Sequence, residues 1–313
     1  MEAVGRRTTL RVLLAVFAWA AGGRSFAEDA GASNFKAVYS DPGLRQRFYL
    51  FLQNVFHLYP EDRFDRLIRQ AASRHDSDAE IYQEVQRRLP EITPRLSHLT
   101  YAMPALAKQK EEMARETAEL LGSMRGVHGY LEIGTPGRYV KALRRRFRID
   151  GDVVVANDSA PGLSLADIAE RGQLRKAGAY VPLGNYDPFD ATRIPDASID
   201  LVTNFIGFHH APADRLDGFV TSIRRVLRPG GRLVVRDHDV SNAEMTAMVA
   251  LAHDVFNAGV GLSWEENHRQ IRNFRSLDEL ERYLAMMGFA RSGGLRLQQG
   301  DPTRNALMLF RRV

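Results

Sequence analysis

Two patterns of hydrophobic and polar positions divide the chain. Up to residue 125 the apolar residues recur at helical spacing, in bands wide enough for burial. The spacing predicts a helical region over 28–125, with helices at 45–59, 62–72, 77–89 and 104–121. Ser77 and Glu80 form a capping-box pattern that starts the third helix, and Pro90 is expected to end it.

From residue 126 onward, short apolar runs alternate with amphipathic stretches. The runs predict strands at 129–133, 153–156, 180–183, 199–205, 232–237, 294–298 and 305–311. The stretches predict helices at 138–147, 163–174, 213–227, 241–256 and 276–287, and Pro229-Gly230-Gly231 reads as a turn. Strands that alternate with helices predict an α/β fold. We therefore expect a doubly wound, mostly parallel, seven-stranded Rossmann-like sheet over 126–313, preceded by the N-terminal helical region.

Residues 1–27 are organised like an export signal. Arg6 and Arg7 begin a basic segment, residues 12–21 are apolar but too few to span a bilayer, and small residues stand at positions 25 and 27 of Ser25-Phe26-Ala27. The run 6–11 resembles a twin-arginine signal, although Thr9 stands where a large hydrophobe is usual. This pattern predicts a periplasmic or secreted protein. A misassigned start or a retained N-terminus would make the protein cytoplasmic.

Composition and charge narrow the function classes. The absence of cysteine excludes disulfides, cysteine nucleophiles and Cys-ligated metal centres. No apolar run is long enough for a membrane-spanning helix, so no stable membrane span is expected. The net charge is +5, but residues 1–27 hold four arginines and one glutamate, so the rest is close to neutral. The basic runs at 144–146 and 224–225 lack interleaved aromatic residues, and no nucleic-acid partner is expected.

Polar residues follow several predicted strands at their carboxyl ends, where ligands bind in open α/β sheets. The segments are 131–139, with an acid and a glycine turn, Asn157-Asp158, 189–191, and 200–212, which ends in a histidine-bearing loop. Neither a Gly-x-Gly-x-x-Gly fingerprint nor a phosphate-binding loop is present, which argues against NAD and ATP.

Three stretches in the second half carry a family resemblance. Residues 190–202 (DATRIPDASIDLV), 209–212 (HHAP) and 224–233 (RRVLRPGGRL) stand in the order and spacing of the corresponding motifs. The region 128–313 thus resembles a class I S-adenosylmethionine-dependent methyltransferase of the type 11-like group. The resemblance implies a methyltransferase sheet and S-adenosylmethionine as cofactor.

The resemblance also implies the residues of the cofactor site, which are Glu132, Gly134, Gly137, Asp158, Asp190, Asn204 and Phe205. It implies that Glu132 lies near the methionine part of the cofactor. Asp158 or Asn157 would bind the ribose hydroxyls, and Asp190 would bind the adenine amino group. Asn204 and Phe205 would lie beside the methyl donor.

The glycine turn departs from the family pattern. Pro136 and Arg138 occupy the positions of the second and third glycines. Proline removes a backbone N–H, and arginine adds a bulky cation at the start of the helix. The alternative to an enzyme is therefore an exported, non-catalytic binding protein with a degenerate methyltransferase fold.

Histidines supply the candidate catalytic groups. Transfer to an alcohol or phenol benefits from a general base, and His238 and His210 are the candidates. The alternatives are that His210 supports its loop and that His238 pairs with Asp237. A metal site built from His209, His238, Asp239 and His253 lacks tight ligand spacing, so no metal is expected. The expected acceptor is an oxygen or nitrogen of a small molecule. Nothing in the sequence indicates an oligomeric state.

Overall fold

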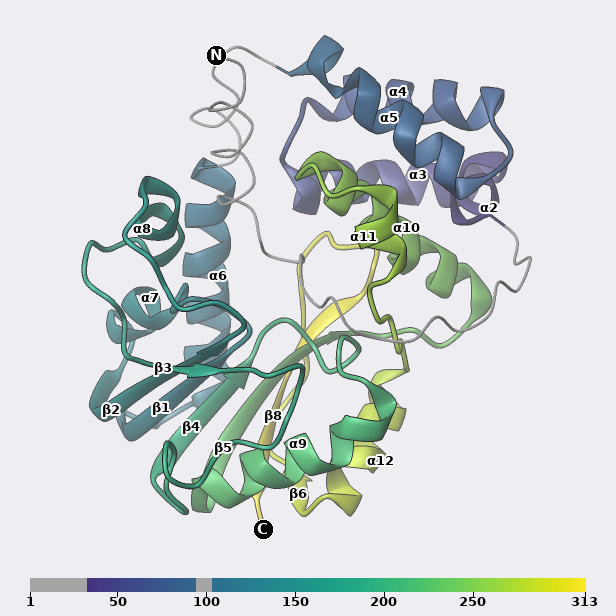
Figure 1. Ribbon diagram of the computed structural model, residues 1–313. Helices are drawn as coiled ribbons and strands as arrows, with labels where there is room; N and C mark the ends of the chain where they lie inside the picture. The colour runs from purple at the N-terminus through teal and green to yellow at the C-terminus, as the bar shows by residue number, and fades with distance from the viewer. Residues whose placement is uncertain (1–32, 94–102) are drawn as a thin grey trace. The chain divides into compact units, whose positions relative to one another are not determined.

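The computed structural model describes residues 33–93 and 103–313, so the predicted signal at 1–27 lies outside the described residues. The chain forms two compact units (Figure 1). Unit 1 contains the described residues up to Leu106, together with His238–Phe274 and Gln298–Asn305. Unit 2 contains Ala107–Asp237, Arg275–Leu297 and Ala306–Val313. This division differs from the expected boundary between 125 and 126, because each unit is assembled from segments distant in sequence.

Unit 1 is helical. Its elements are α2 (Asn34–Ser40), α3 (Pro42–Phe51), the π-helical turn η1 (Leu52–Phe56), α4 (Glu61–Arg74), α5 (Asp78–Ile92), α10 (Ala243–Gly259) and α11 (Trp264–His268). The helix expected over 45–59 changes to a π-turn and stops where His57 adopts a left-handed φ of 45°. The predicted cap at Ser77 is confirmed, but α5 continues through Pro90 to Ile92, which is buried. The short α11 was not among the helices predicted from the sequence.

The core of unit 1 surrounds α10, which is buried along most of its length. Aromatic side chains such as Phe48, Phe56 and Phe64 fill the space between α10 and the N-terminal helices. The Tyr59 hydroxyl donates a hydrogen bond to the Gly259 carbonyl at 2.8 Å, so one buried aromatic ring also satisfies the end of α10.

Unit 2 is an α/β sheet. Its strands are β1 (Gly126–Ile133), β2 (Arg148–Asn157), β3 (Ala179–Pro182), β4 (Ile199–Asn204), β5 (Leu227–His238), β6 (Phe289–Arg291), β7 (Arg296–Leu297) and β8 (Asn305–Arg312). Its helices are α6 (Met103–Leu121), α7 (Val140–Arg144), α8 (Leu165–Arg171), α9 (Ala213–Val226) and α12 (Leu277–Met286). The order β3-β2-β1-β4-β5-β8-β6 makes a path of seven strands, and β7 pairs with β8. β1 to β5 are mutually parallel, and β6 is antiparallel to β8.

Side chains alternate between the two faces of this sheet, as expected of doubly wound strands. Leu131, Val202 and Val235 pack with α9 and α12 on one face. Tyr130 and Leu201 pack with α6 and α7 on the other face. The predicted mostly parallel α/β fold, with a helical region at the N-terminus, is confirmed.

Several predicted bounds in unit 2 were wrong. The helix expected at 138–147 is reduced to α7, because residues 134–139 form an irregular turn instead of a first helical turn. Pro229-Gly230-Gly231, expected as a turn, belongs to β5. β6 was not predicted, because three residues carry too little periodicity. None of the helices in the described ranges is long and apolar enough to cross a membrane.

Candidate functional site

Glu132 lies in β1, one residue before its end, with its carboxylate fully buried. It accepts hydrogen bonds from the Tyr130 hydroxyl at 3.0 Å, from the Thr135 hydroxyl, and from the Tyr139 backbone N–H at 3.2 Å. Burial raises its pKa, and these donors partly oppose that effect. Both oxygens of the predicted cofactor acid are therefore engaged by β1 and the turn that follows it.

The glycine turn is packed tightly by apolar side chains. Gly134 and Gly137 have φ values of +80° and +88°, a conformation that favours glycine. A Cβ on Gly134 would stand 2.2 Å from the Ile206 side chain, and one on Gly137 would stand 2.4 Å from the Ala177 Cβ. Both glycines are thus required by the fold itself, and Ile206 covers the space beside Gly134.

Arg138, at the third glycine position, turns into the protein. Its side chain is 1% exposed and forms an ion pair with Glu170 of α8, which is also buried. Burial lowers the pKa of Arg138. The ion pair connects the glycine turn to α8. The Arg138 guanidinium is therefore buried and is not exposed at the start of the helix.

Two acids follow β2 and β3. The Asp158 carboxylate, just after β2, is half-buried and receives no hydrogen bond or ion pair from any residue in the described ranges. Burial raises its pKa to about 7. Asp190 is exposed, and its carboxylate accepts hydrogen bonds from the backbone N–H and the hydroxyl of Thr192, both at 2.8 Å. Those donors lower the pKa of Asp190.

Asn204 ends β4 and is completely buried. Neither its amide oxygen nor its amide nitrogen has a hydrogen-bond partner within residues 33–93 and 103–313. Such buried orphan groups are rare, because each loses its hydration without compensation. Phe205 packs edge-on against Tyr139, with ring centroids 4.7 Å apart, and so connects the end of β4 to the turn after β1.

His209, in the loop that follows β4, and Asp237, near the end of β5, form a buried pair. His209 Nδ1 lies 2.6 Å from Asp237 Oδ1, and Asp237 Oδ2 accepts a hydrogen bond from the Phe208 N–H at 2.9 Å. Gly207, at φ +86°, makes room for this pair, because a Cβ there would stand 2.5 Å from His209 Nδ1. His209 was not among the bases expected from the sequence. The signal was the adjacent pair His209-His210, whose rings lie 4.1 Å apart.

His238 belongs to unit 1, although it ends β5. Because successive side chains of a strand point to opposite faces of the sheet, the side chains of His238 and Asp237 point in opposite directions. Its Nδ1 lies 3.1 Å from the Thr303 carbonyl oxygen, and its Nε2 lies 3.4 Å from the Asn305 amide nitrogen. The catalytic roles of His238 and His210 stay predictions.

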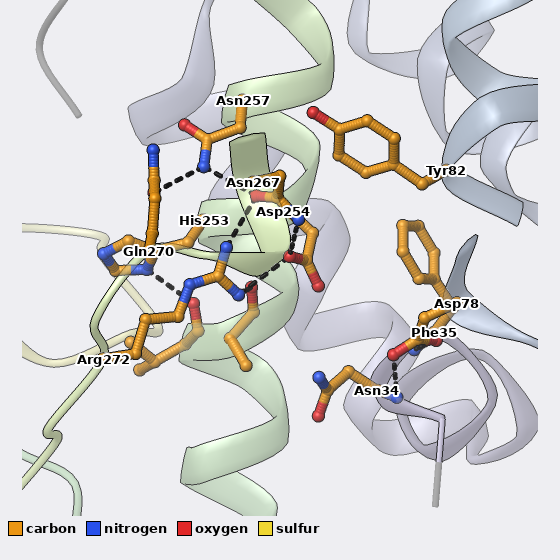
Figure 2. A network of polar contacts seen from close by, with 12 residues as sticks. Asn34, Phe35, Asp78, Tyr82, His253, Asp254, Asn257, Asn267, Gln270 and Arg272 are labelled. Carbon is orange, nitrogen blue, oxygen red and sulfur yellow. Dashed lines mark hydrogen bonds and ion pairs between the residues drawn. The ribbon is translucent and has the colours of Figure 1, made fainter. Parts of the chain in front are cut away.

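Unit 1 has its own buried polar network on α10 (Figure 2). Arg272 donates to Asp254 at 2.8 Å, Asn267 donates to the same oxygen at 2.8 Å, and Asn257 donates to Asn267 at 2.7 Å. These bonds join α10 to α11 and the segment that follows it. The network therefore has a structural role in holding this end of unit 1.

Comparison with known proteins bears on the strand-end region of unit 2. Residues 131–235 match the family model of the methyltransferase domain. The matched segment, which is less than half of the chain, includes Glu132, Asp158, Asp190, Asn204 and His209, and Asp237 follows it closely. It begins in β1 and ends in β5.

Solved methyltransferase structures resemble part of the chain. One is a 1,6-didemethyltoxoflavin-N1-methyltransferase from Burkholderia thailandensis, with 14% identity, coverage of 67% of this chain and 79% of that one, and a TM-score of 0.43. Another is an S-adenosylmethionine-dependent methyltransferase from Mesorhizobium loti, with 14% identity, coverage of 66% and 100%, and a TM-score of 0.45. At these values the likeness does not indicate an activity. No curated protein matches the sequence.

Proposed function

We propose that unit 2 binds S-adenosylmethionine at the carboxyl ends of its parallel strands and transfers the methyl group to an oxygen or nitrogen of a small molecule. The observation that carries this proposal is the buried, unpartnered amide of Asn204 at the end of β4. A bound ligand with polar groups would remove the cost of burying that amide. The match of residues 131–235 to the methyltransferase domain gives the ligand its chemical class.

The residues present fit a nucleoside on one side of the site. Asp158 offers a half-buried carboxylate without a donor among the described residues, which suits a ribose diol. β2 and β4 flank β1, so the ends of β2 and β4 lie about 10 Å apart. That separation lets Asp158 hold the ribose while Asn204 and Phe205 border the sulfonium group. Asp190 would bind the adenine amino group if its carboxylate exchanged the hydrogen bonds from Thr192 for one from that amino group.

The protein's contribution to methyl transfer is alignment and proton removal. S-adenosylmethionine supplies an electrophilic methyl carbon, whose bond to sulfur breaks as the bond to the acceptor atom forms. Strand-end residues hold the acceptor in line with that bond. His209 accepts the proton that the acceptor loses, and the Asp237 carboxylate orients the imidazole and stabilises its charged form. His210 is the alternative base within unit 2.

A methyl-transfer assay tests this function. The purified chain is incubated with S-adenosylmethionine and separate pools of phenols, alcohols and amines, and formation of S-adenosylhomocysteine is measured. We expect turnover with one pool. Loss of turnover in Asp237→Asn, with cofactor binding retained, would support the role of the His209–Asp237 pair. Binding of the cofactor without turnover in any pool would favour the second function below.

A binding protein with the same fold is the second candidate. The observation in its favour is the filled glycine turn, because Ile206 occupies the space beside Gly134 and both Glu132 oxygens are engaged within the protein. In this function the site holds a nucleoside or another small polar ligand and carries out no transfer. Ile206→Ala distinguishes the two functions. If Ile206 obstructs the cofactor, the variant should bind S-adenosylmethionine more tightly than the native protein, which favours the binding protein. Unchanged binding would favour the enzyme.

We further propose that residues 1–27 direct export of the folded chain to the periplasm or beyond. The support is the sequence pattern of paired arginines, an apolar stretch and small residues at 25 and 27. Cell fractionation with N-terminal sequencing of the recovered protein tests it. A cytoplasmic protein that retains residues 1–27 would contradict export and would also place the protein where the methyl donor is made.

A further inference from the structure

The surface around α8 in unit 2 exposes three leucines that the proposed function does not use. Leu163 and Leu174 are each 68% exposed, and Leu165 is 83% exposed. Within the described ranges, three of the eight exposed large apolar side chains thus belong to one short segment. Clustered exposed apolar residues indicate an interaction surface more often than scattered ones do.

This segment is held in an ordered shape. Arg171, which is completely buried, donates one hydrogen bond to the Gly162 carbonyl at 2.8 Å and another to the Leu174 carbonyl at 3.3 Å. One guanidinium therefore binds both the stretch that carries Leu163 and the stretch that carries Leu174. Ser164 and Asp167 form a capping box at the start of α8, so Leu165 begins a capped helix.

Cations border these leucines. Lys141, Arg175 and Lys176 are exposed, and Lys141 Nζ donates to the Gly172 carbonyl at 2.6 Å, which brings α7 to the end of α8. The acids of α8 do not cancel this charge at the surface. Glu170 is buried and paired with Arg138, and Asp167, which accepts a hydrogen bond from Ser164, is a single negative charge beside three cations.

We propose that this α8 surface, which consists of Leu163, Leu165 and Leu174 bordered by Lys141, Arg175 and Lys176, binds an anionic lipid membrane. The leucines would enter the boundary between headgroups and acyl chains, while the cations contact lipid phosphates. The apolar side chains favour lipid over nucleic acid, because a phosphate backbone gives them nothing to bury against. The proposal is independent of methyl transfer.

Vesicle sedimentation with the full chain tests the proposal. We compare vesicles of phosphatidylcholine with vesicles that also contain phosphatidylglycerol. Native protein should sediment with the anionic vesicles, and L163S/L165S/L174S should bind them about tenfold more weakly or worse. M286S is the matched control, because Met286 is 79% exposed on α12, and it should bind like the native protein. Residues 12–21 are present in every variant, so any difference reports on the α8 surface.

Charge and folding controls complete the test. R175Q/K176Q should weaken binding to the anionic vesicles only. Added salt should reduce the difference in vesicle binding between this variant and the native protein. If the triple variant does not fold, L165S alone should still reduce binding. Equal binding of the native and leucine variants would overturn the proposal. Two other results would also overturn it. One is that the native protein binds a DNA duplex and the leucine variants bind it equally well. The other is that the native protein self-associates instead of binding vesicles, and that the triple variant does not self-associate.

Discussion

His209 Nδ1, in the loop that follows β4, and Asp237 Oδ1, near the end of the adjacent parallel strand β5, are 2.6 Å apart. If the pair removes the acceptor's proton, Asp237→Asn should lower the rate of methyl transfer by about 100-fold or more. Cofactor affinity should change little, because Asp237 contacts the histidine and not the proposed nucleoside site. Comparison of initial rates with cofactor binding in the same variant checks this. Equal losses of both would mean that Asp237 maintains the structure of the loop.

Gly207 is predicted to be essential for the same pair. Gly207→Ala places a Cβ 2.5 Å from His209 Nδ1 and also strains a φ of +86°. We expect it to abolish turnover and to lower the free energy of unfolding by about 1–3 kcal/mol. The matched control is Gly230→Ala, at φ +76°, because no atom of the described residues lies within 4 Å of the added Cβ. It should cost stability alone, as measured by urea unfolding and activity.

The buried Arg138–Glu170 pair gives a prediction for stability. Arg138→Met alone leaves the Glu170 carboxylate buried without its cation and should destabilise the protein by about 3–5 kcal/mol. The double variant Arg138→Met/Glu170→Leu removes both charges and should recover most of that loss. A double-mutant cycle by chemical denaturation measures the coupling. Additive single and double effects would show that the two side chains do not interact.

Asp158 gives a prediction for pH dependence. Burial raises its pKa to about 7, and ribose hydroxyls bind a carboxylate better than a carboxylic acid. Affinity for adenosine, which has no group that titrates near neutrality, should therefore rise from about pH 6 to about pH 8. Asp158→Asn should bind more weakly and without this slope. A slope that persists in Asp158→Asn would assign it to another group.

The same pKa has a consequence for folding. Because the folded pKa of Asp158 lies above its ordinary value, the folded state binds this proton more tightly than the unfolded state does. The free energy of unfolding of the native protein should therefore fall as pH rises from about 4 to about 7, relative to Asp158→Asn. Denaturation curves of the two proteins across that range check the sign.

The sheet and the identity of its strand ends could be predicted from the sequence, whereas the arrangement of side chains at those ends could not. The short apolar runs in segments such as 153–156 and 199–205 predict strands buried on two faces, and glycine and acid positions predict where they end. Whether Asp237 contacts His238 or His209 depends on strand alternation together with a loop held open by Gly207. The inward direction of the Arg138 side chain could not be predicted either. It depends on an ion pair with Glu170 of α8, and no local sequence pattern shows that these two residues are partners.

Titration calorimetry of the purified chain with S-adenosylmethionine tests the central claim most directly. The proposed site at the ends of β1, β2 and β4 predicts binding at a single site, weakened about tenfold or more by Asn204→Leu, which removes the buried amide that the ligand would satisfy. Asp187→Asn, an exposed acid that pairs with Arg215, serves as the control and should bind like the native chain. No detectable heat at millimolar ligand, or unchanged binding in Asn204→Leu, would contradict the account.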